Sequence, residues 1–222
     1  MWIRLLESLQ YLFGLMKPPR VLPGASPLET KRERAAKALQ ARGFILEGAI
    51  PFRYFVVHHS KSKDGQVHDW PSIKNYHMSW RYEGNIITEE KAKALLSQGV
   101  KGVQSKWSDI GYHAGEELIN GVYQLQIGRP LTAAGAHAIG FNLNGFGFLC
   151  AGDFDLTPPS DTLWQLSVEL AADAINYWTD LSVENVIGHW ETYDMRHVPR
   201  EKSCPGFKFD MPKLRKDIKG II

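Results

Sequence analysis

The chain has 222 residues, of which 44% are hydrophobic, and its formal net charge is +2. A chain of this size and composition can bury a core, and we expect one domain with an extension. The small net charge gives no reason to expect a nucleic-acid partner, and none is predicted.

Residues 1–16 place apolar side chains at helical spacing, with charged and polar residues between them. The run is too short and too charged to span a bilayer, and it lacks the parts of a cleavable secretory signal. Three interpretations stay open: a helix packed on the domain, attachment to a membrane surface, or docking to another subunit. Without a cleavable signal, we expect the protein to stay in the cytoplasm until release or to be membrane-associated.

Prolines in Lys17–Arg20 end this first helix, because proline cannot continue the helical hydrogen-bond ladder. The block Ser26-Pro27-Leu28-Glu29 then predicts a second helix, with serine at the N-cap and glutamate in the first turn. This helix is expected to run to about Ala41, and Gly43 is suited to end it.

From Tyr54 the pattern changes to β-branched and aromatic residues, which predicts a strand over Tyr54–His59. Successive side chains of a strand point to opposite faces, so His58 and His59 are expected to face opposite ways. Helices are predicted next, over Pro71–Trp80 and over Thr88–Leu96.

Asn120-Gly121 predicts a tight hairpin between strands over Tyr112–Ile119 and Val122–Gly128. The later elements are expected to be a loop over 129–144, a strand over 146–151, a helix opened by Ser160 and a strand over 183–188. Strands interspersed with helices predict an α/β fold with a mixed central β-sheet flanked by helices. We predict a helical N-terminal extension over residues 1–45 and the main domain over 46–222.

The sequence contains two cysteines, Cys150 and Cys204. Cys150 lies in the apolar run Phe146–Ala151, where a free cysteine behaves as a small hydrophobic residue. We therefore predict that Cys150 is buried and free, without a disulfide to Cys204.

Near the C-terminus, Gly188–Glu191 and Glu201–Gly206 bring an imidazole, a thiolate and an ammonium group close together in sequence. Zinc prefers nitrogen and sulfur ligands, and a hydrolytic zinc site uses three protein ligands with the fourth position left to water. This segment supplies two ligands, so a third must come from elsewhere. The best candidates are His58 and His59, at the end of the predicted strand.

Four blocks now combine into a larger pattern: Val57–Ser60, Trp107–His113, Gly135–Asn142, and the pair Gly188–Glu191 with Glu201–Gly206. In this order they resemble the zinc-dependent N-acetylmuramoyl-L-alanine amidases, which include amidase-type phage lysozymes and peptidoglycan recognition proteins. The resemblance covers roughly residues 52 to 210. It implies an amidase/peptidoglycan-recognition-protein-like sheet in the main domain.

The resemblance also implies a ligand set. Matched block by block, it makes His58, His189 and Cys204 the ligands of a catalytic Zn²⁺ and leaves His59 as a neighbour. Two imidazoles and one thiolate leave the ion a residual positive charge, with which it can polarise a carbonyl and lower the pKa of water.

Further residues are assigned in the same way. Tyr112 and Lys202 match the catalytic tyrosine and lysine of the family, which would stabilise the oxyanion formed from the attacked amide. His137 and Asn142 lie in the glycine-rich loop that contributes to the substrate groove, so we predict them as substrate-binding residues. Simpler interpretations remain: Tyr112 as an ordinary strand aromatic, and His137 as a support of the loop.

The implied function is cleavage of the amide between N-acetylmuramic acid and L-alanine of the stem peptide, in the manner of an endolysin. Two alternatives remain, a peptidoglycan-binding module without activity and a cytosolic amidase that recycles muropeptides. The expected partner is peptidoglycan or a muropeptide, with membrane-surface or protein contact through residues 1–16. The stretch from Tyr82 to Lys106 is long compared with the family that the sequence resembles, and we expect it to wall or cover the groove.

Overall fold

A computed structural model describes residues 29–62 and 69–222. The chain divides into two units, Met1–Thr30 and Lys31–Ile222, and all the elements described below belong to the second. The helix predicted over residues 1–16 lies outside the described residues, and the domain boundary near residue 45 stays a prediction. Within the described ranges, no helix combines the length and hydrophobicity needed to cross a membrane.

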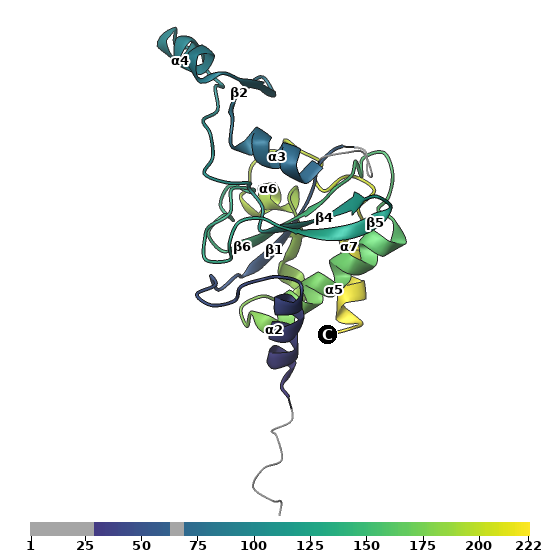
Figure 1. Ribbon diagram of the computed structural model, residues 1–222. Helices are drawn as coiled ribbons and strands as arrows, with labels where there is room; N and C mark the ends of the chain where they lie inside the picture. The colour runs from purple at the N-terminus through teal and green to yellow at the C-terminus, as the bar shows by residue number, and fades with distance from the viewer. Residues whose placement is uncertain (1–28, 63–68) are drawn as a thin grey trace, which may run out of the picture. The chain divides into compact units, whose positions relative to one another are not determined.

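The centre of the second unit is a five-stranded sheet in the order β5-β4-β6-β1-β7 (Figure 1). Its strands are β1 (Tyr54–His59), β4 (Ala114–Ile119), β5 (Val122–Ile127), β6 (Gly145–Cys150) and β7 (Val186–Gly188). Strand β1 pairs in parallel with β6 and β7, β4 pairs in parallel with β6, and β4 pairs antiparallel with β5. The prediction of a mixed central sheet is therefore confirmed.

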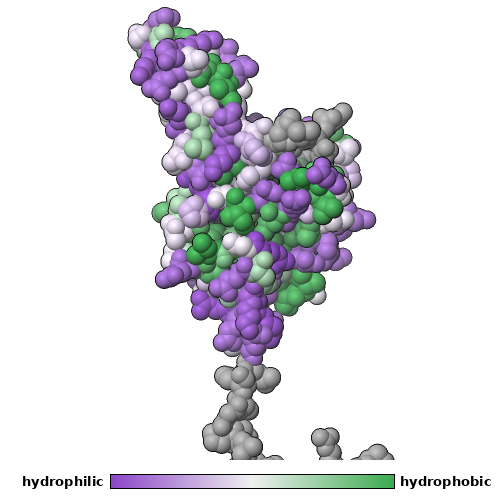
Figure 2. All heavy atoms as spheres, viewed as in Figure 1, coloured by the Kyte–Doolittle hydropathy of each residue, from purple (hydrophilic) through white to green (hydrophobic). Residues whose placement is uncertain are grey.

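Helices lie on both faces of this sheet, as Figure 1 shows. On one side are α2 (Lys31–Ala41), α5 (Asp161–Tyr177) and α7 (Met211–Lys219), and on the other are α3 (Asp69–His77) and α6 (Glu191–Met195). The outer surface of α2 is hydrophilic in Figure 2, as its lysines and arginines predict.

Residues 80–105 form an arm that carries β2 (Trp80–Tyr82), β3 (Asn85–Ile87) and α4 (Glu89–Ser97). Strands β2 and β3 pair antiparallel, and two backbone hydrogen bonds of 3.0 and 2.8 Å between Arg81 and Gln104 close the base of the arm. The helix predicted over 88–96 is confirmed, and the Thr88 side chain caps it by accepting from the Lys91 N–H.

Several predicted boundaries are wrong. Helix α3 ends at His77 rather than Trp80, because Trp80 already pairs with Ile87 in the arm. Helix α2 starts only at Lys31. It ends as predicted, since Gly43 adopts a φ of +95° and the Phe44 N–H bonds back to the Leu39 carbonyl.

At the other end of the fold, β4 starts at Ala114 rather than Tyr112, after a bend where the Gly111 carbonyl accepts from the Ala136 N–H. The last strand is shorter than predicted, because Val183–Asn185 forms a 3-10 turn before β7. The hairpin prediction is confirmed, with Asn120 and Gly121 both at positive φ, 52° and 81°.

Alternate side chains of β1 pack in two different hydrophobic clusters, one on each face of the sheet. Phe55 and Val57 are fully buried in the main core, which is built on α5 and α7. Val56 points the other way and packs with a smaller cluster that includes Phe141 and Ile187. Cys150 of β6 is buried and forms no disulfide, as predicted.

Glu116 of β4 is an acid inside the fold, only 5% exposed, and its Oε2 atom has no hydrogen-bond partner among the described residues. Burial raises the pKa of Glu116 from 4.5 to about 7, although the Arg42 charge opposes the shift. Because the pKa is higher in the folded state, the protonated form of Glu116 stabilises the folded protein. This contribution to the free energy of unfolding is fully present below pH 4.5 and is lost as the pH rises from about 4.5 to 7.

We therefore expect Glu116→Gln to gain stability relative to the wild type as the pH rises. The difference in unfolding free energy should change by roughly 2–3 kcal/mol between pH 5 and pH 8. Urea denaturation at the two pH values measures it. An equal difference at both values would show that Glu116 does not titrate in this range.

Candidate metal centre

Two histidines meet at the carboxyl ends of neighbouring parallel strands. His58 is the fifth residue of β1 and is 1% exposed, and His189 follows the last residue of β7 directly. Strand β7 pairs in register with β1, Val57 opposite Gly188, and the His189 N–H donates to the Val57 carbonyl at 3.0 Å. The two imidazole rings therefore lie with their centroids 4.6 Å apart.

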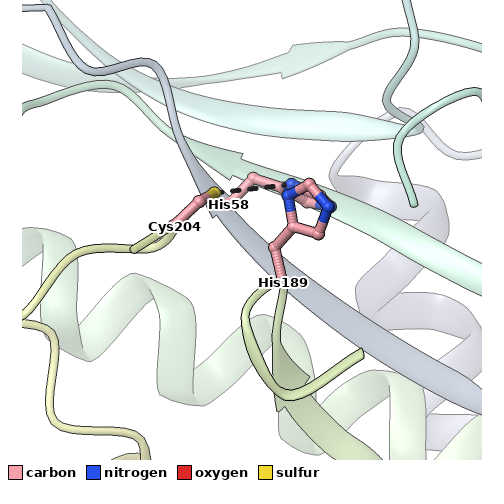
Figure 3. A group of neighbouring side chains, drawn as sticks. All are labelled: His58, His189 and Cys204. Carbon is pink, nitrogen blue, oxygen red and sulfur yellow. Dashed lines mark hydrogen bonds between the residues drawn. The ribbon is translucent and has the colours of Figure 1, made fainter. Parts of the chain in front are cut away.

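Cys204 reaches the same point from the C-terminal loop. Its carbonyl accepts from the Trp190 N–H at 2.7 Å, which ties this loop to the turn that carries His189. Its Sγ atom accepts from the His59 N–H at 3.3 Å and lies 3.6 Å from the Nδ1 atom of His58. Figure 3 shows the three side chains converging from these different segments.

His58, His189 and Cys204 form a group that fits a zinc ion. Their ligand atoms all lie within 4.8 Å of one another, and no other such group occurs within residues 29–62 and 69–222. In a tetrahedral zinc site, ligand bonds of about 2.1 and 2.3 Å place nitrogen and sulfur about 3.6 Å apart. The His58–Cys204 separation of 3.6 Å agrees with that geometry.

Burial keeps all three groups neutral when no cation is present. It lowers the pKa of His58 well below the ordinary value, in the same direction as repulsion from any proton bound to His189 or His137, and it lowers the pKa of His189 to about 4. It raises the pKa of the Cys204 thiol to about 12. A divalent cation reverses this preference for the thiol, since it stabilises the thiolate. Two neutral imidazoles, together with a thiol that can lose its proton, are therefore suitable ligands for a metal ion.

The group opens into a groove with a volume of about 2110 Å³. The groove is lined near the metal centre by His58, Tyr112, His189 and Cys204, and farther along by residues of α3 and of the arm. Ile86, Val103, Gln104 and Ser105 of the arm all contribute to the lining. The predicted role of the 82–106 stretch as a wall of the groove therefore agrees with the structure.

The sequence matches the family Amidase_2, described as N-acetylmuramoyl-L-alanine amidase, over residues 48–207. The chain belongs to this family. The resemblance drawn from the four sequence blocks is thereby confirmed. A comparison with curated proteins gave no match.

Among solved structures, the chain is similar to the N-acetylmuramoyl-L-alanine amidase LysC from Clostridium intestinale, with a TM-score of 0.48 and 20% identity over 77% of this chain and 87% of that one. It is also similar to Drosophila PGRP-LB, with a TM-score of 0.47 and 20% identity over 82% and 91% of the two chains. The Ph2119 endolysin of a Thermus scotoductus bacteriophage gives a TM-score of 0.46 and 17% identity over 76% and 86%.

The two residues predicted to be catalytic in this amidase-family chain both line the groove. The Tyr112 ring lies 5.0 Å from the His58 ring, centroid to centroid, and desolvation raises the pKa of Tyr112, so its phenol stays protonated. Lys202 is exposed on the Cys204 loop, and its charge is, after burial, the largest cause that lowers the pKa of His189.

His137 makes a contact that the sequence did not predict. Its Nδ1 atom lies 3.0 Å from the His58 Nε2 atom, and its Nε2 atom lies 3.1 Å from the Gly145 carbonyl. A carbonyl only accepts, so His137 carries its proton on Nε2 and accepts at Nδ1 from His58. His58 then carries its proton on Nε2, which leaves Nδ1 free on the side of Cys204.

Gly147 of β6 makes room for this arrangement. A Cβ atom at Gly147 would lie 2.5 Å from the His137 ring, so any larger residue there would displace the ring. Both ring nitrogens of His137 are engaged within the protein, and its contact with substrate stays a prediction.

Asn142, the other predicted substrate-binding residue, supports the loop. Its Oδ1 atom accepts from the His137 and Ala138 N–H groups, at 2.7 and 2.8 Å. It is not among the residues that line the groove in the described part of the chain, so the geometry favours loop support over substrate contact. His113, the last residue of the Trp107–His113 block, is fully buried against Phe52 and Phe146.

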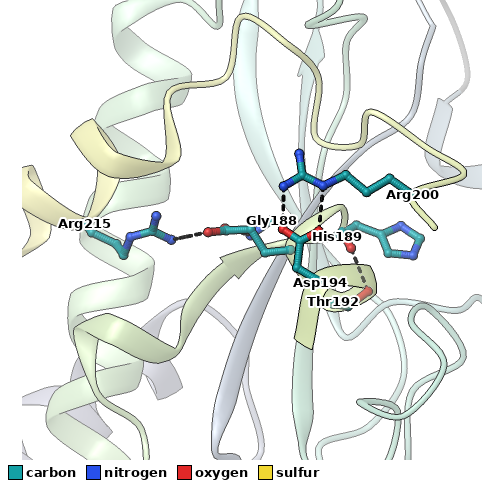
Figure 4. A network of polar contacts seen from close by, with 7 residues as sticks. Gly188, His189, Thr192, Asp194, Arg200 and Arg215 are labelled. Atoms are coloured by element: carbon teal, nitrogen blue, oxygen red, sulfur yellow. Dashed lines mark hydrogen bonds and ion pairs between the residues drawn. The ribbon is translucent and has the colours of Figure 1, made fainter. Parts of the chain in front are cut away.

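The turn that carries His189 is fixed by its own motif. The Thr192 hydroxyl donates to the His189 carbonyl at 2.7 Å, and the Gly188 N–H donates to Glu191 at 2.7 Å. Arg215 of α7 donates in turn to Glu191 at 3.1 Å, and Figure 4 shows this network around His189. The glutamate of the Gly-His-Trp-Glu block thus holds the backbone beside the ligand, a role that the motif alone did not reveal.

Asp155 fixes the Cys204 loop in a similar way. One carboxylate oxygen accepts from the Ser203 hydroxyl at 2.7 Å and the other from the Phe207 N–H at 3.1 Å, so the acid spans both sides of Cys204. Lys61 pairs with the same carboxylate at 3.5 Å. Sequence reasoning missed Asp155, because nothing in its local pattern marks a residue that acts across 48 positions.

Proposed function

We propose that the protein is a zinc-dependent N-acetylmuramoyl-L-alanine amidase, which hydrolyses the amide between the lactyl group of N-acetylmuramic acid and L-alanine of the stem peptide. The observation that carries this proposal is the convergence of His58, His189 and Cys204 at one groove in a chain of this family. A zinc ion held there would supply a Lewis acid and would lower the pKa of water towards neutrality.

Tyr112 and Lys202 are proposed to act on the oxygen of the scissile amide. That oxygen gains negative charge as the amide is attacked, and donors placed beforehand stabilise it. The protonated phenol of Tyr112 offers a hydrogen bond from the wall of the groove. The Lys202 ammonium offers a positive charge from the loop of Cys204. We further propose that the physiological substrate is the intact wall, as for an endolysin.

The decisive experiment is mass spectrometry of purified peptidoglycan after digestion, with and without a chelator. We expect free stem peptides with an N-terminal L-alanine, their disappearance after chelation, and their return when zinc is added back. Cleavage that persists in the chelator would contradict zinc dependence. Binding to the wall without release of peptides would instead identify a recognition module.

A second comparison tests the choice of substrate. Equal amounts of muramic-acid–alanine bonds are supplied as intact sacculi or as small soluble muropeptides. An endolysin-like enzyme should degrade the sacculi, whereas a recycling amidase should act on the soluble fragments alone.

A further inference from the structure

Arg81, at the base of the arm, is a buried cation in the wall of the groove. Its side chain lines the groove, and the whole residue is only 2% exposed. The guanidinium carbon lies over two aromatic rings, 4.6 Å from the Trp107 centroid and 5.0 Å from the Tyr76 centroid. Contact with two rings restricts the positions that the guanidinium can take.

The protein itself leaves most of this guanidinium unused. One nitrogen donates to the Ser105 carbonyl at 3.3 Å, but the Nε atom is buried without a hydrogen-bond partner in the described residues. No carboxylate of the described residues forms an ion pair with Arg81. Burial lowers the pKa of Arg81, which reflects the cost of a desolvated cation. A buried charge of this kind is usually paired.

Arg81 is also within reach of a ligand held at the metal centre. Successive contacts lead from the His58 ring to Tyr112 at 5.0 Å, from Tyr112 to His77 at 5.6 Å, from His77 to Trp107 at 4.5 Å, and on to Arg81. An extended peptide covers about 3.3–3.6 Å per residue. These steps set an upper limit on the separation, and an extended peptide of about six residues that starts at the metal centre is long enough to cover them.

The charge of the groove favours an acidic ligand. Besides Arg81, the described lining contains the basic residues Lys61, Arg200, Lys202 and Lys208. The acids of this lining are Asp155, Glu201 and Asp210. Asp155 is paired with Lys61, Arg200 is paired with Asp194 outside the lining, and Asp210 caps α7 by accepting from the Lys213 N–H. A guanidinium binds a carboxylate through two parallel hydrogen bonds, which suits a fixed, stacked group.

We propose that Arg81 binds a carboxylate of the peptide part of the substrate, so that the arm selects peptides with a free acid at this position. This inference rests on the proposed function, because it takes the peptide to start at the metal centre. The carboxylate is either the C-terminal group of the peptide or one on a side chain.

The test measures binding of N-acetylmuramoyl peptides by calorimetry in the presence of a chelator, so that the ligand is not cleaved. Three forms of one peptide are compared, with free carboxylates, with the C-terminus amidated, and with the side-chain carboxylates amidated. We expect one of the two amides to weaken binding by about 10- to 100-fold, as for the loss of a charged hydrogen bond. The amide that does so identifies the carboxylate.

Variants then assign the effect to Arg81. Arg81→Met keeps an apolar chain between the two rings, and it should bind the free acid as weakly as the amide. Arg81→Lys keeps the charge without the planar fork and should recover only part of the difference. Lys101→Ala, which removes an exposed charge from the same arm, is the matched control and should behave as the wild type.

Equal binding of the free and amidated peptides by the wild type would overturn the proposal, even if Arg81→Met failed to fold. The same would follow if Arg81→Met folded and still discriminated between them. Failure of the proposed function appears separately, as intact muropeptide after incubation with the zinc-loaded enzyme. That result leaves the binding comparison valid.

Discussion

Replacing Cys204 by alanine is expected to abolish both stoichiometric zinc binding and the release of stem peptides from purified wall. The thiol is the sole sulfur of the group, and its Sγ atom stands 3.6 Å from the His58 Nδ1 atom. Loss of a residue that only supports a ligand lowers metal affinity about 10- to 100-fold, and loss of a ligand should exceed that. Competition with a chromophoric chelator measures the affinity, and mass spectrometry measures the release.

Cys150→Ala is the matched control, because Cys150 is the other cysteine of the chain and is also buried without a disulfide. It should keep both zinc and activity, although it removes a packing atom from the core. Retention of wall cleavage by zinc-free Cys204→Ala would remove the proposed mechanism. Retention of zinc with normal affinity would show that the ion is held elsewhere.

Replacing His137 by alanine is expected to lower zinc affinity by about 10- to 100-fold, with a corresponding loss of activity at limiting zinc. The reason is the proton on His58: without the acceptor at His137 Nδ1, nothing keeps that proton on Nε2 and leaves Nδ1 free to bind the metal. Burial lowers the pKa of His137 to about 3, so the ring remains a neutral acceptor across the physiological range.

Two further variants separate this positioning role from substrate contact. His137→Asn keeps an acceptor near the position of Nδ1 and should recover part of the zinc affinity. His197→Asn, at an exposed histidine with a φ of 56°, should match the wild type. If His137→Ala kept full zinc affinity and only raised KM, His137 would be a substrate-binding residue, as the sequence pattern predicts.

Some structural features of this protein follow from the local sequence, and others do not. The strand of Tyr54–His59, the Asn120-Gly121 hairpin and the helix that follows Thr88 were all predicted, because each depends on residues adjacent in sequence. The boundaries that were predicted wrongly lie where a contact with a residue elsewhere in the sequence sets the end of the helix or the start of the strand. Trp80 lies outside the preceding helix because it pairs with Ile87. Tyr112 lies before the start of β4, where the chain bends at the hydrogen bond between Gly111 and Ala136.

The site divides in the same way. The residues proposed as metal ligands stand in short motifs, which named His189, Cys204 and either His58 or His59 as candidates, and the family resemblance then selected His58. Alternation along a strand also predicted that His58 and His59 face opposite ways, and the packing of Val56 and Phe55 on opposite faces agrees.

The residues that hold these candidate ligands in position could be identified only from the tertiary structure. Asp155 beside the Cys204 loop, His137 behind His58 and the unpaired Arg81 act through hydrogen bonds or stacking between segments far apart in the chain. The local sequence pattern does not predict such contacts, because the two side chains come together only when the sheet and the loops pack. The sequence therefore determined the candidate ligands and most of the elements, while packing determined the proton on His58, the anchoring of Cys204 and the charge left free in the groove.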